Sequence, residues 1–150
     1  MAYFGLERKV ERALQNLLDA VNLDGVPVYL GSDTNDETEE GEQGMRLPFI
    51  LCICDDASQD LEGVLDGVYR ARARVEVWTH RDDEPGVTAD ARSATVRDAL
   101  LTDDLSARLS NAIADFHCFR VLETGLSTDN SQEATMQTIT MTLAVGSFDA

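Results

Sequence analysis

Residues Tyr69 to His80 alternate between two kinds of side chain. The first set is Tyr69, Ala71, Ala73, Val75 and Val77, and the second set is Arg70, Arg72, Arg74, Glu76 and Trp78. Successive side chains of a β-strand point to opposite faces, so this period of two predicts a long strand, buried on one side and half exposed on the other. The exposed side carries three guanidinium groups in a row.

Helical patterns lie on both sides of this strand. Apolar residues three and four positions apart between residues 5 and 21 predict an amphipathic N-terminal helix. Residues 88–101 and 103–114 are predicted to form two further helical stretches. Thr88 opens the first of them, and Asp103 or Asp104 opens the second, as plausible N-caps.

Four other segments have the character of strands. Residues 26–30 predict a short edge strand, because Pro27 has no N–H to donate. The apolar run LPFILCIC at 47–54 predicts a strand covered on both faces, and residues 116–123 and 136–145 supply two closing strands. Since strands and helices do not alternate strictly, the order indicates an α+β fold with a mainly antiparallel sheet packed against helices. The length of 150 residues fits a single domain over residues 1–150.

Two polar stretches are predicted to be loops. Residues 31–44, GSDTNDETEEGEQG, contain three glycines and no aliphatic or aromatic residue, so we expect a mobile acidic loop over 31–46. Its acidic residues are Asp33, Asp36, Glu37, Glu39, Glu40 and Glu42. Residues 124–135, TGLSTDNSQEAT, are expected to form a long polar hairpin loop.

The acidic loop accounts for much of an unusual net charge. The chain has 28 acidic and 12 basic residues, a net charge of −16, and eleven of the acids fall between residues 33 and 66 with Arg46 as the one basic residue there. This balance argues against sequence-independent binding to nucleic acid and against docking on anionic membranes. No window approaches the ~20 apolar residues of a membrane span, and no secretory signal begins the chain, so we expect a soluble protein.

The residues that most often carry catalysis or metal binding are few. Cys52 and Cys54 lie on one predicted strand and with Cys118 could supply thiolates to zinc, although packing in the core explains them better. Three cysteines, an odd number, suit a reducing cytoplasm. His80 and His117 have no serine or cysteine signature beside them, so structural or solvated roles are expected.

Two loop motifs also fail the tests for a ligand site. Asp33, Asn35 and Glu37 have the spacing of the start of a calcium loop, but the later glycine and glutamate are not at the required offsets. Gly63 and Gly67 flank a predicted turn and do not form a phosphate-binding loop. We therefore expect no catalytic residues, no cofactor and no metal, and we do not expect an enzyme.

The arginine row allows two interpretations. Arg70, Arg72 and Arg74 could meet threonines or acidic residues on neighbouring strands of the same chain. Alternatively, with Trp78 as an aromatic anchor, they form a candidate subunit interface that meets the acidic 33–66 region of the next subunit. Such head-to-tail complementarity is what a closed ring of identical subunits needs.

The order of elements resembles the tail-terminator, or tail-completion, proteins of long-tailed bacteriophages. The resembling segments cover most of the chain: GLERKVERALQNLLDAV, VPVYL, LPFILCIC, SQDLEGVLDGVYRARARVEVWTHRDD, VTADARSATVRDALLTDDLSARLSNAI, FHCFRVLETG and MQTITMTLAVG. The acidic insertion at 31–44 departs from the pattern. These proteins share a pattern of elements more than fixed residues, so no site residue transfers from them.

The resemblance implies a structural role. It implies a virion protein, assembled in the bacterial host cytoplasm, that forms a ring, typically a hexamer, capping the tail tube and meeting the neck or head-completion proteins. Within such a ring the acidic loop would line a channel through which DNA passes without being bound. Two other functions remain open: a different neck or tail adaptor protein, and an acidic DNA mimic that occupies a nucleic-acid-binding protein. A hydrolase or metalloenzyme is a more distant alternative.

Overall fold

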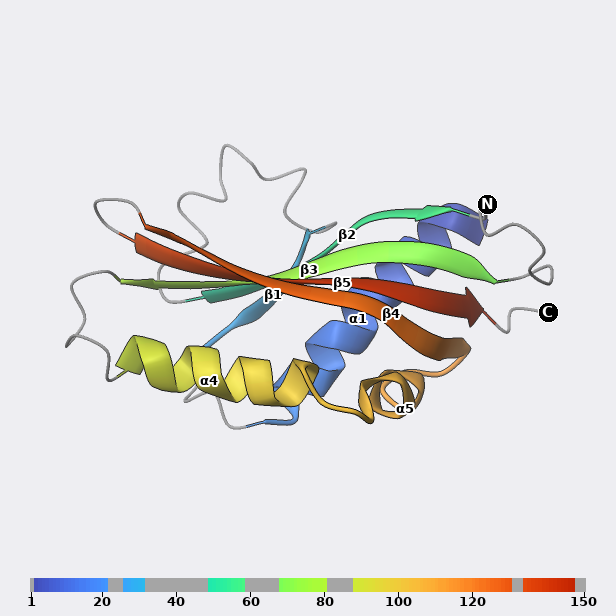
Figure 1. Cartoon of the computed structure of the whole chain (residues 1–150). Coiled ribbons are helices and arrows are strands. Elements are labelled where there is room, and N and C mark those ends of the chain that lie inside the picture. Colours follow the sequence, from blue (N-terminus) through green and yellow to red (C-terminus); the bar gives the residue numbers. More distant parts are fainter. Residues whose placement is uncertain are drawn as a thin grey trace.

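In the part of the chain that the structure describes, a five-stranded sheet carries three helices on one of its faces (Figure 1). The computed structural model describes residues 2–21, 26–31, 49–58, 68–80, 88–130 and 134–147. The helices are α1 (Ala2–Asp19), α4 (Thr88–Leu100) and α5 (Leu105–Ser110). The strands are β1 (Val28–Leu30), β2 (Phe49–Ser58), β3 (Tyr69–His80), β4 (Phe116–Asn130) and β5 (Ala134–Ser147).

The strands lie in the order β1-β2-β3-β5-β4. β1 pairs with β2 in parallel, and the three other pairings are antiparallel. The expected α+β fold with a mainly antiparallel sheet is therefore confirmed, as is the position of residues 28–30 at a sheet edge. None of the helices within the described residues is long and apolar enough to cross a membrane.

The core lies between the helices and the apolar face of the sheet. Leu6, Val10, Leu14 and Leu18 of α1 are almost fully buried, as the three- and four-residue spacing predicts. They join a cluster with the alternate residues of the strands, such as Val75 of β3. α1 is also fastened to the segment before β4, since Lys9 Nζ and Asn16 Nδ2 donate to the carbonyl oxygens of Asp115 and Ala112 at 3.2 and 3.1 Å.

Glu11 closes the edge of β2 at the point where β1 ends. Its side chain is 3% exposed, and its Oε2 accepts the backbone N–H of Cys54 at 2.9 Å. β1 pairs with β2 only as far as Leu30 opposite Cys52. The carboxylate thus satisfies a buried backbone donor beyond the last residue of β1. Gly31 makes this approach possible, because a Cβ there would lie 2.8 Å from Ile53 Cγ1 and 3.3 Å from Glu11 Oε2.

The predicted polar hairpin loop at 124–135 is wrong in its extent. β4 continues to Asn130 and β5 begins at Ala134, so most of that stretch is paired strand. The polar composition misleads because β4 is the outermost strand and most of its residues from Glu123 to Asp129 are exposed. Polar side chains are compatible with a half-solvated strand.

Three smaller expectations differ or cannot be compared. β2 extends four residues past Cys54, with a register shift between Cys54 and Asp56 that makes Asp55 the extra residue of a bulge. Asp104 precedes α5 but makes no side-chain capping hydrogen bond, because its Oδ1 accepts the hydroxyl of Thr102 at 2.8 Å. The expected acidic loop at 31–46 lies, except for Gly31, outside the described residues.

Candidate functional site

The face of the sheet opposite the helices carries the arginine row of β3. We call it the helix-free face, because none of the described helices lies on it, and we define it by Arg70, Arg72, Arg74, Glu76 and Trp78. On β5 the residues opposite Arg72, Arg74 and Glu76 are Thr142, Thr140 and Thr138. The alternation of β3 dictates this arrangement, since its other side chains enter the core.

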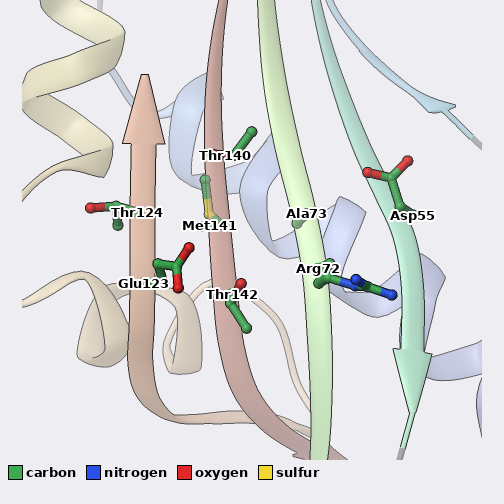
Figure 2. A pocket seen from close by; sticks show the side chains of 8 residues that line it. All are labelled: Asp55, Arg72, Ala73, Glu123, Thr124, Thr140, Met141 and Thr142. Carbon is green, nitrogen blue, oxygen red and sulfur yellow. The ribbon is translucent and has the colours of Figure 1, made fainter. Parts of the chain in front are cut away.

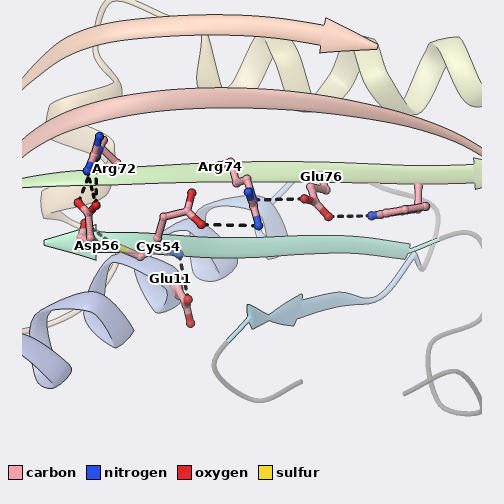
Figure 3. A network of polar contacts seen from close by, with 8 residues as sticks. Glu11, Cys54, Asp56, Arg72, Arg74 and Glu76 are labelled. Carbon is pink, nitrogen blue, oxygen red and sulfur yellow. Dashed lines mark hydrogen bonds and ion pairs between the residues drawn. The ribbon is translucent and has the colours of Figure 1, made fainter. Parts of the chain in front are cut away.

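Arg72 forms a two-pronged ion pair with Asp56 of β2. Its Nε lies 3.2 Å from Oδ1 and 3.1 Å from Oδ2, and its Nη2 also contacts Oδ2 (Figure 3). The two residues are direct partners in the antiparallel β2–β3 ladder. Because the Arg72 and Asp56 side chains are 65% and 41% exposed, water screens the pair. The ion pair therefore orients the guanidinium group of Arg72 more than it stabilises the fold.

Arg74 and Glu76 continue the network toward Trp78 (Figure 3). Arg74 lies between two carboxylates, with its Nη2 3.6 Å from Asp55 Oδ1 and its Nε 3.2 Å from Glu76 Oε2. The Arg74–Glu76 contact is an ion pair without hydrogen-bond geometry, because no acceptor is aligned with the Nε–H. Glu76 in turn accepts the indole N–H of Trp78 at 3.0 Å.

Three aromatic rings complete this face. Trp78 stacks on Phe49 with ring centroids 5.7 Å apart and an interplanar angle of 16°, and Phe49 meets Tyr29 edge-on at 6.1 Å. They come from β3, β2 and β1, which are neighbours in the sheet. Such contacts add to the stabilisation from apolar burial, so the rings are held in place.

Arg70 stands apart from the other arginines. Its Nε is buried and has no hydrogen-bond partner among the described residues. It lies opposite Ser58 on β2 and Ala144 on β5. The structure therefore joins Arg74 to Trp78 through Glu76 and pairs Arg72 separately with Asp56, while Arg70 has no such contact among the described residues.

A shallow hollow lies across the middle of the sheet. Its volume is about 220 Å³. Its lining residues are Asp55, Arg72, Ala73, Glu123, Thr124, Thr140, Met141 and Thr142 (Figure 2). Binding sites for drug-sized molecules are usually ~300–1,000 Å³ and mainly apolar, so the hollow is a weak candidate for a ligand site.

The buried thiols are not set up as nucleophiles. Burial is the largest cause that raises the pKa of Cys52, Cys54 and Cys118, and the pKa of Cys118 reaches about 11. Thiolate is the form that attacks or binds metal, so these thiols are chemically quiet at neutral pH. Within the described residues, no group of three or more histidines, cysteines and carboxylates is placed to hold a metal ion.

Carboxylates near the buried edge of β2 influence one another. The pKa of Glu7 is raised by burial first, and then by the charges of Glu11 and Asp56.

Of the two histidines, His117 packs its ring edge-on against Phe119 at 4.5 Å, whereas the side chain of His80 lies outside the described residues. The acidic residues Asp33, Asp36, Glu37, Glu39, Glu40 and Glu42 also lie outside them.

No family model and no curated protein sequence matches this chain. The geometry of the helix-free face is therefore the main basis for a function.

Arg72 and Arg74 meet acidic residues of a neighbouring strand of the same chain. This is the first of the two interpretations of the arginine row. The sequence pattern missed Asp55, Asp56 and Glu76 as their partners. The signal was present in the two acids that follow LPFILCIC, which an extended β2 carries alongside β3.

Proposed function

We propose that this protein is a structural subunit of a long-tailed bacteriophage virion. It assembles into a ring, taken as a hexamer, that caps the tail tube and contacts the neck or head-completion proteins. The order of elements supports this through its resemblance to tail terminators. The structural observation that supports it best is the helix-free face, a preorganised surface of arginine–carboxylate pairs and stacked rings.

Preorganisation suits this face to assembly. Association is opposed by the loss of side-chain freedom, at roughly 0.5–1.5 kcal/mol for each side chain that becomes ordered on binding. Arg72, Arg74 and Trp78 are already held by partners in their own subunit. Tryptophan and arginine are also the residue types most enriched in binding hot spots. Trp78, which is half-buried, is the proposed anchor.

The ion pairs change the expected form of the interface. A bare row of arginines would attract the acidic region of the next subunit, but Arg72 and Arg74 are neutralised by Asp56, Asp55 and Glu76. The proposed contact is therefore close to neutral on the β3 side and depends on shape, aromatic burial and hydrogen bonds. Its salt dependence is expected to be weak.

The same pairs weaken the DNA-mimic alternative for this face. A mimic must present carboxylates to a basic protein in place of phosphates. Asp55, Asp56 and Glu76 instead point to arginines of the same chain. The acidic residues 33–46 keep their proposed place along a channel that lets DNA pass, and their appearance on the outer rim of an assembled ring would contradict it.

Native mass spectrometry with negative-stain imaging tests the proposed function. The purified protein is measured at low and moderate salt, alone and with tail-tube protein. We expect rings, and we expect Trp78→Ala to reduce them. Leu101→Ala is the matched control, because Leu101 is an exposed apolar side chain, 43% accessible, outside the helix-free face.

The other outcomes each decide a stated part of the proposal. A persistent monomer in the presence of tube protein would contradict the ring. Rings that bind neck proteins but not the tube would favour a neck adaptor. Arg72→Glu combined with Asp56→Arg rebuilds the pair within the chain, so a ring lost in Arg72→Glu and regained in the double variant assigns Arg72 a structural role. A ring that stays lost in the double variant assigns Arg72 a contact with the next subunit.

A further inference from the structure

The two outer edges of the sheet end in different ways. At the β1–β2 edge, α1 side chains hydrogen-bond the strand backbones: Gln15 Nε2 donates to the carbonyl oxygen of Val28 at 2.9 Å, and Glu11 accepts the N–H of Cys54 at 2.9 Å. Pro27 also precedes β1 and has no N–H. This edge is blocked against the addition of another strand.

Among the described residues, side chains block the β4 edge only at its start. Ser110 of α5 accepts the N–H of Cys118 at 2.9 Å, and its hydroxyl lies 3.2 Å from the carbonyl oxygen of the same residue. Beyond this point, within the described residues, no side chain of another element hydrogen-bonds the backbone of β4 from Arg120 to Asp129. The outermost strand of the sheet therefore continues to Asn130 with an open outer edge.

Apolar side chains gather on this open strand. The described residues include four exposed large hydrophobic side chains, and three of them lie on β4: Phe119 at 48%, Leu122 at 41% and Leu126 at 47% exposed. Phe119 and Leu122 are the extra residues at the two register shifts of the β4–β5 ladder. Exposed apolar side chains beside unpaired strand edges are typical of an association surface.

We propose that β4 pairs antiparallel with β4 of a second copy of this chain, across a two-fold axis at Gly125. The two sheets then continue into one another. Pairing two copies of the open edge leaves the blocked β1–β2 edges at the two outer ends. Because the contact is isologous, each residue pair across the axis occurs twice.

The charges of β4 are self-complementary in this register. Arg120 of one copy lies opposite Asp129 of the other, and the pair is repeated on the far side of the axis. Arg120 and Asp129 are both exposed, and they face Ala144 and Met136 of β5, so both lie on the helix-free face. Oppositely charged pairs directly across two strands are stabilising.

The centre of the register also fits. Glu123 lies opposite Ser127, and Thr124 lies opposite Leu126, so no like charges meet. Gly125 on the axis has no side chain, and a Cβ there would lie 2.7 Å from Thr140 Oγ1. Along the chain, Arg120 is one residue farther from Gly125 than Asp129 is. Leu122, the extra residue of a bulge in each strand, makes up this difference, so Arg120 and Asp129 still lie opposite each other.

This contact goes beyond the proposed ring and does not rest on it. Closed rings of cyclic symmetry use head-to-tail contacts, whereas a two-fold contact joins subunits in pairs. A dimer of this kind joins two free subunits, or two subunits that belong to two different rings. Failure of one contact therefore leaves the other measurable.

Analytical ultracentrifugation over a concentration series at about 0.15 M salt tests the pairing. We expect a monomer–dimer equilibrium in the unchanged protein. Arg120→Asp and Asp129→Arg should each raise the dimer Kd about tenfold, because two attractive pairs become repulsive. The double variant carrying both changes should return the Kd to within about threefold of the original, because the pairs are restored in reverse.

The control variants are Arg12→Asp and Asp98→Arg. They change the net charge by the same amounts at exposed helical positions of α1 and α4, and they should leave the Kd unchanged. A protein that stays monomeric at all concentrations would overturn the pairing. So would a dimer that is indifferent to the two single variants, or one that the double variant fails to restore.

Discussion

The carboxylate of Glu11 accepts the backbone N–H of Cys54 at 2.9 Å, although the two residues are 43 positions apart in the chain. Glu11 lies on the buried side of α1 among leucines and is 3% exposed. A buried carboxylate is unfavourable unless it is hydrogen-bonded. Here it completes the hydrogen bonding of β2 where β1 stops, so it links the first helix to the sheet.

Replacement of Glu11 tests the value of this hydrogen bond. Glu11→Leu leaves the N–H of Cys54 buried without an acceptor, so we expect the free energy of unfolding to fall by about 1–3 kcal/mol. Glu11→Gln keeps a carbonyl oxygen as acceptor and should lose less. Urea denaturation measures both variants. Equal stability of the two would show that the acceptor does not matter.

The Arg72–Asp56 pair is expected to add little stability. Both side chains are more than one-third exposed, so Arg72→Ala and Asp56→Ala should each change the free energy of unfolding by less than about 1 kcal/mol. A double-mutant cycle by chemical denaturation isolates the pair, and its coupling energy should also be below about 1 kcal/mol. A coupling above about 2 kcal/mol would refute the view that the pair mainly orients the guanidinium group.

Two glycines should respond to alanine in opposite ways. A Cβ at Gly31 would lie 2.8 Å from Ile53 Cγ1, so Gly31→Ala should lower the unfolding free energy by about 1–3 kcal/mol through overpacking. A Cβ at Gly5, inside α1, meets nothing within 4 Å, so Gly5→Ala should raise it by up to about 1 kcal/mol. Thermal or urea unfolding compares them. Changes of the same sign would contradict the packing around Gly31.

The buried thiols should react slowly and make stability depend on alkaline pH. Burial raises the pKa of Cys118 from 9.0 to about 11, so the native state keeps its proton where the unfolded state loses it. This contribution to stability is complete below pH 9 and is lost as the pH rises toward 11. At pH 8 a disulfide reagent should label Cys118 at least ~100-fold more slowly in the native protein than in urea. Equal rates would show that Cys118 is accessible.

Local patterns predicted the elements better than their partners. The alternation of Tyr69–His80 gave β3 with the correct ends, because a period of two has one structural meaning over twelve residues. The apolar spacing of α1 was equally clear. Composition alone misled at residues 124–130, because an exposed edge strand and a polar loop have similar residues. The pairing of residues 124–130 with β5 depends on the tertiary structure, which composition does not show.

The sequence predicted only one half of the candidate site, the row on β3. The exposed row of Arg72, Arg74 and Trp78 follows from the alternation, whereas the partners of these residues depend on the register of β2. The bulge at Asp55 sets that register, and it brings Asp56 opposite Arg72. A buried Glu11 was also not expected, since an acidic residue beside an apolar stripe is normally placed in water.

The position of β5 has a consequence for how the protein is made. β5 follows the other four strands in the chain, yet it lies between β3 and β4 in the sheet. While a ribosome is still synthesising it, β3 has an unpaired flank and β4 has no neighbour. The sheet therefore cannot form one strand at a time during synthesis, because β3 and β4 are joined only when β5 is present. Nascent chains halted at Asn130 should be cut readily by protease, and resistance should appear only after Ser147 has emerged.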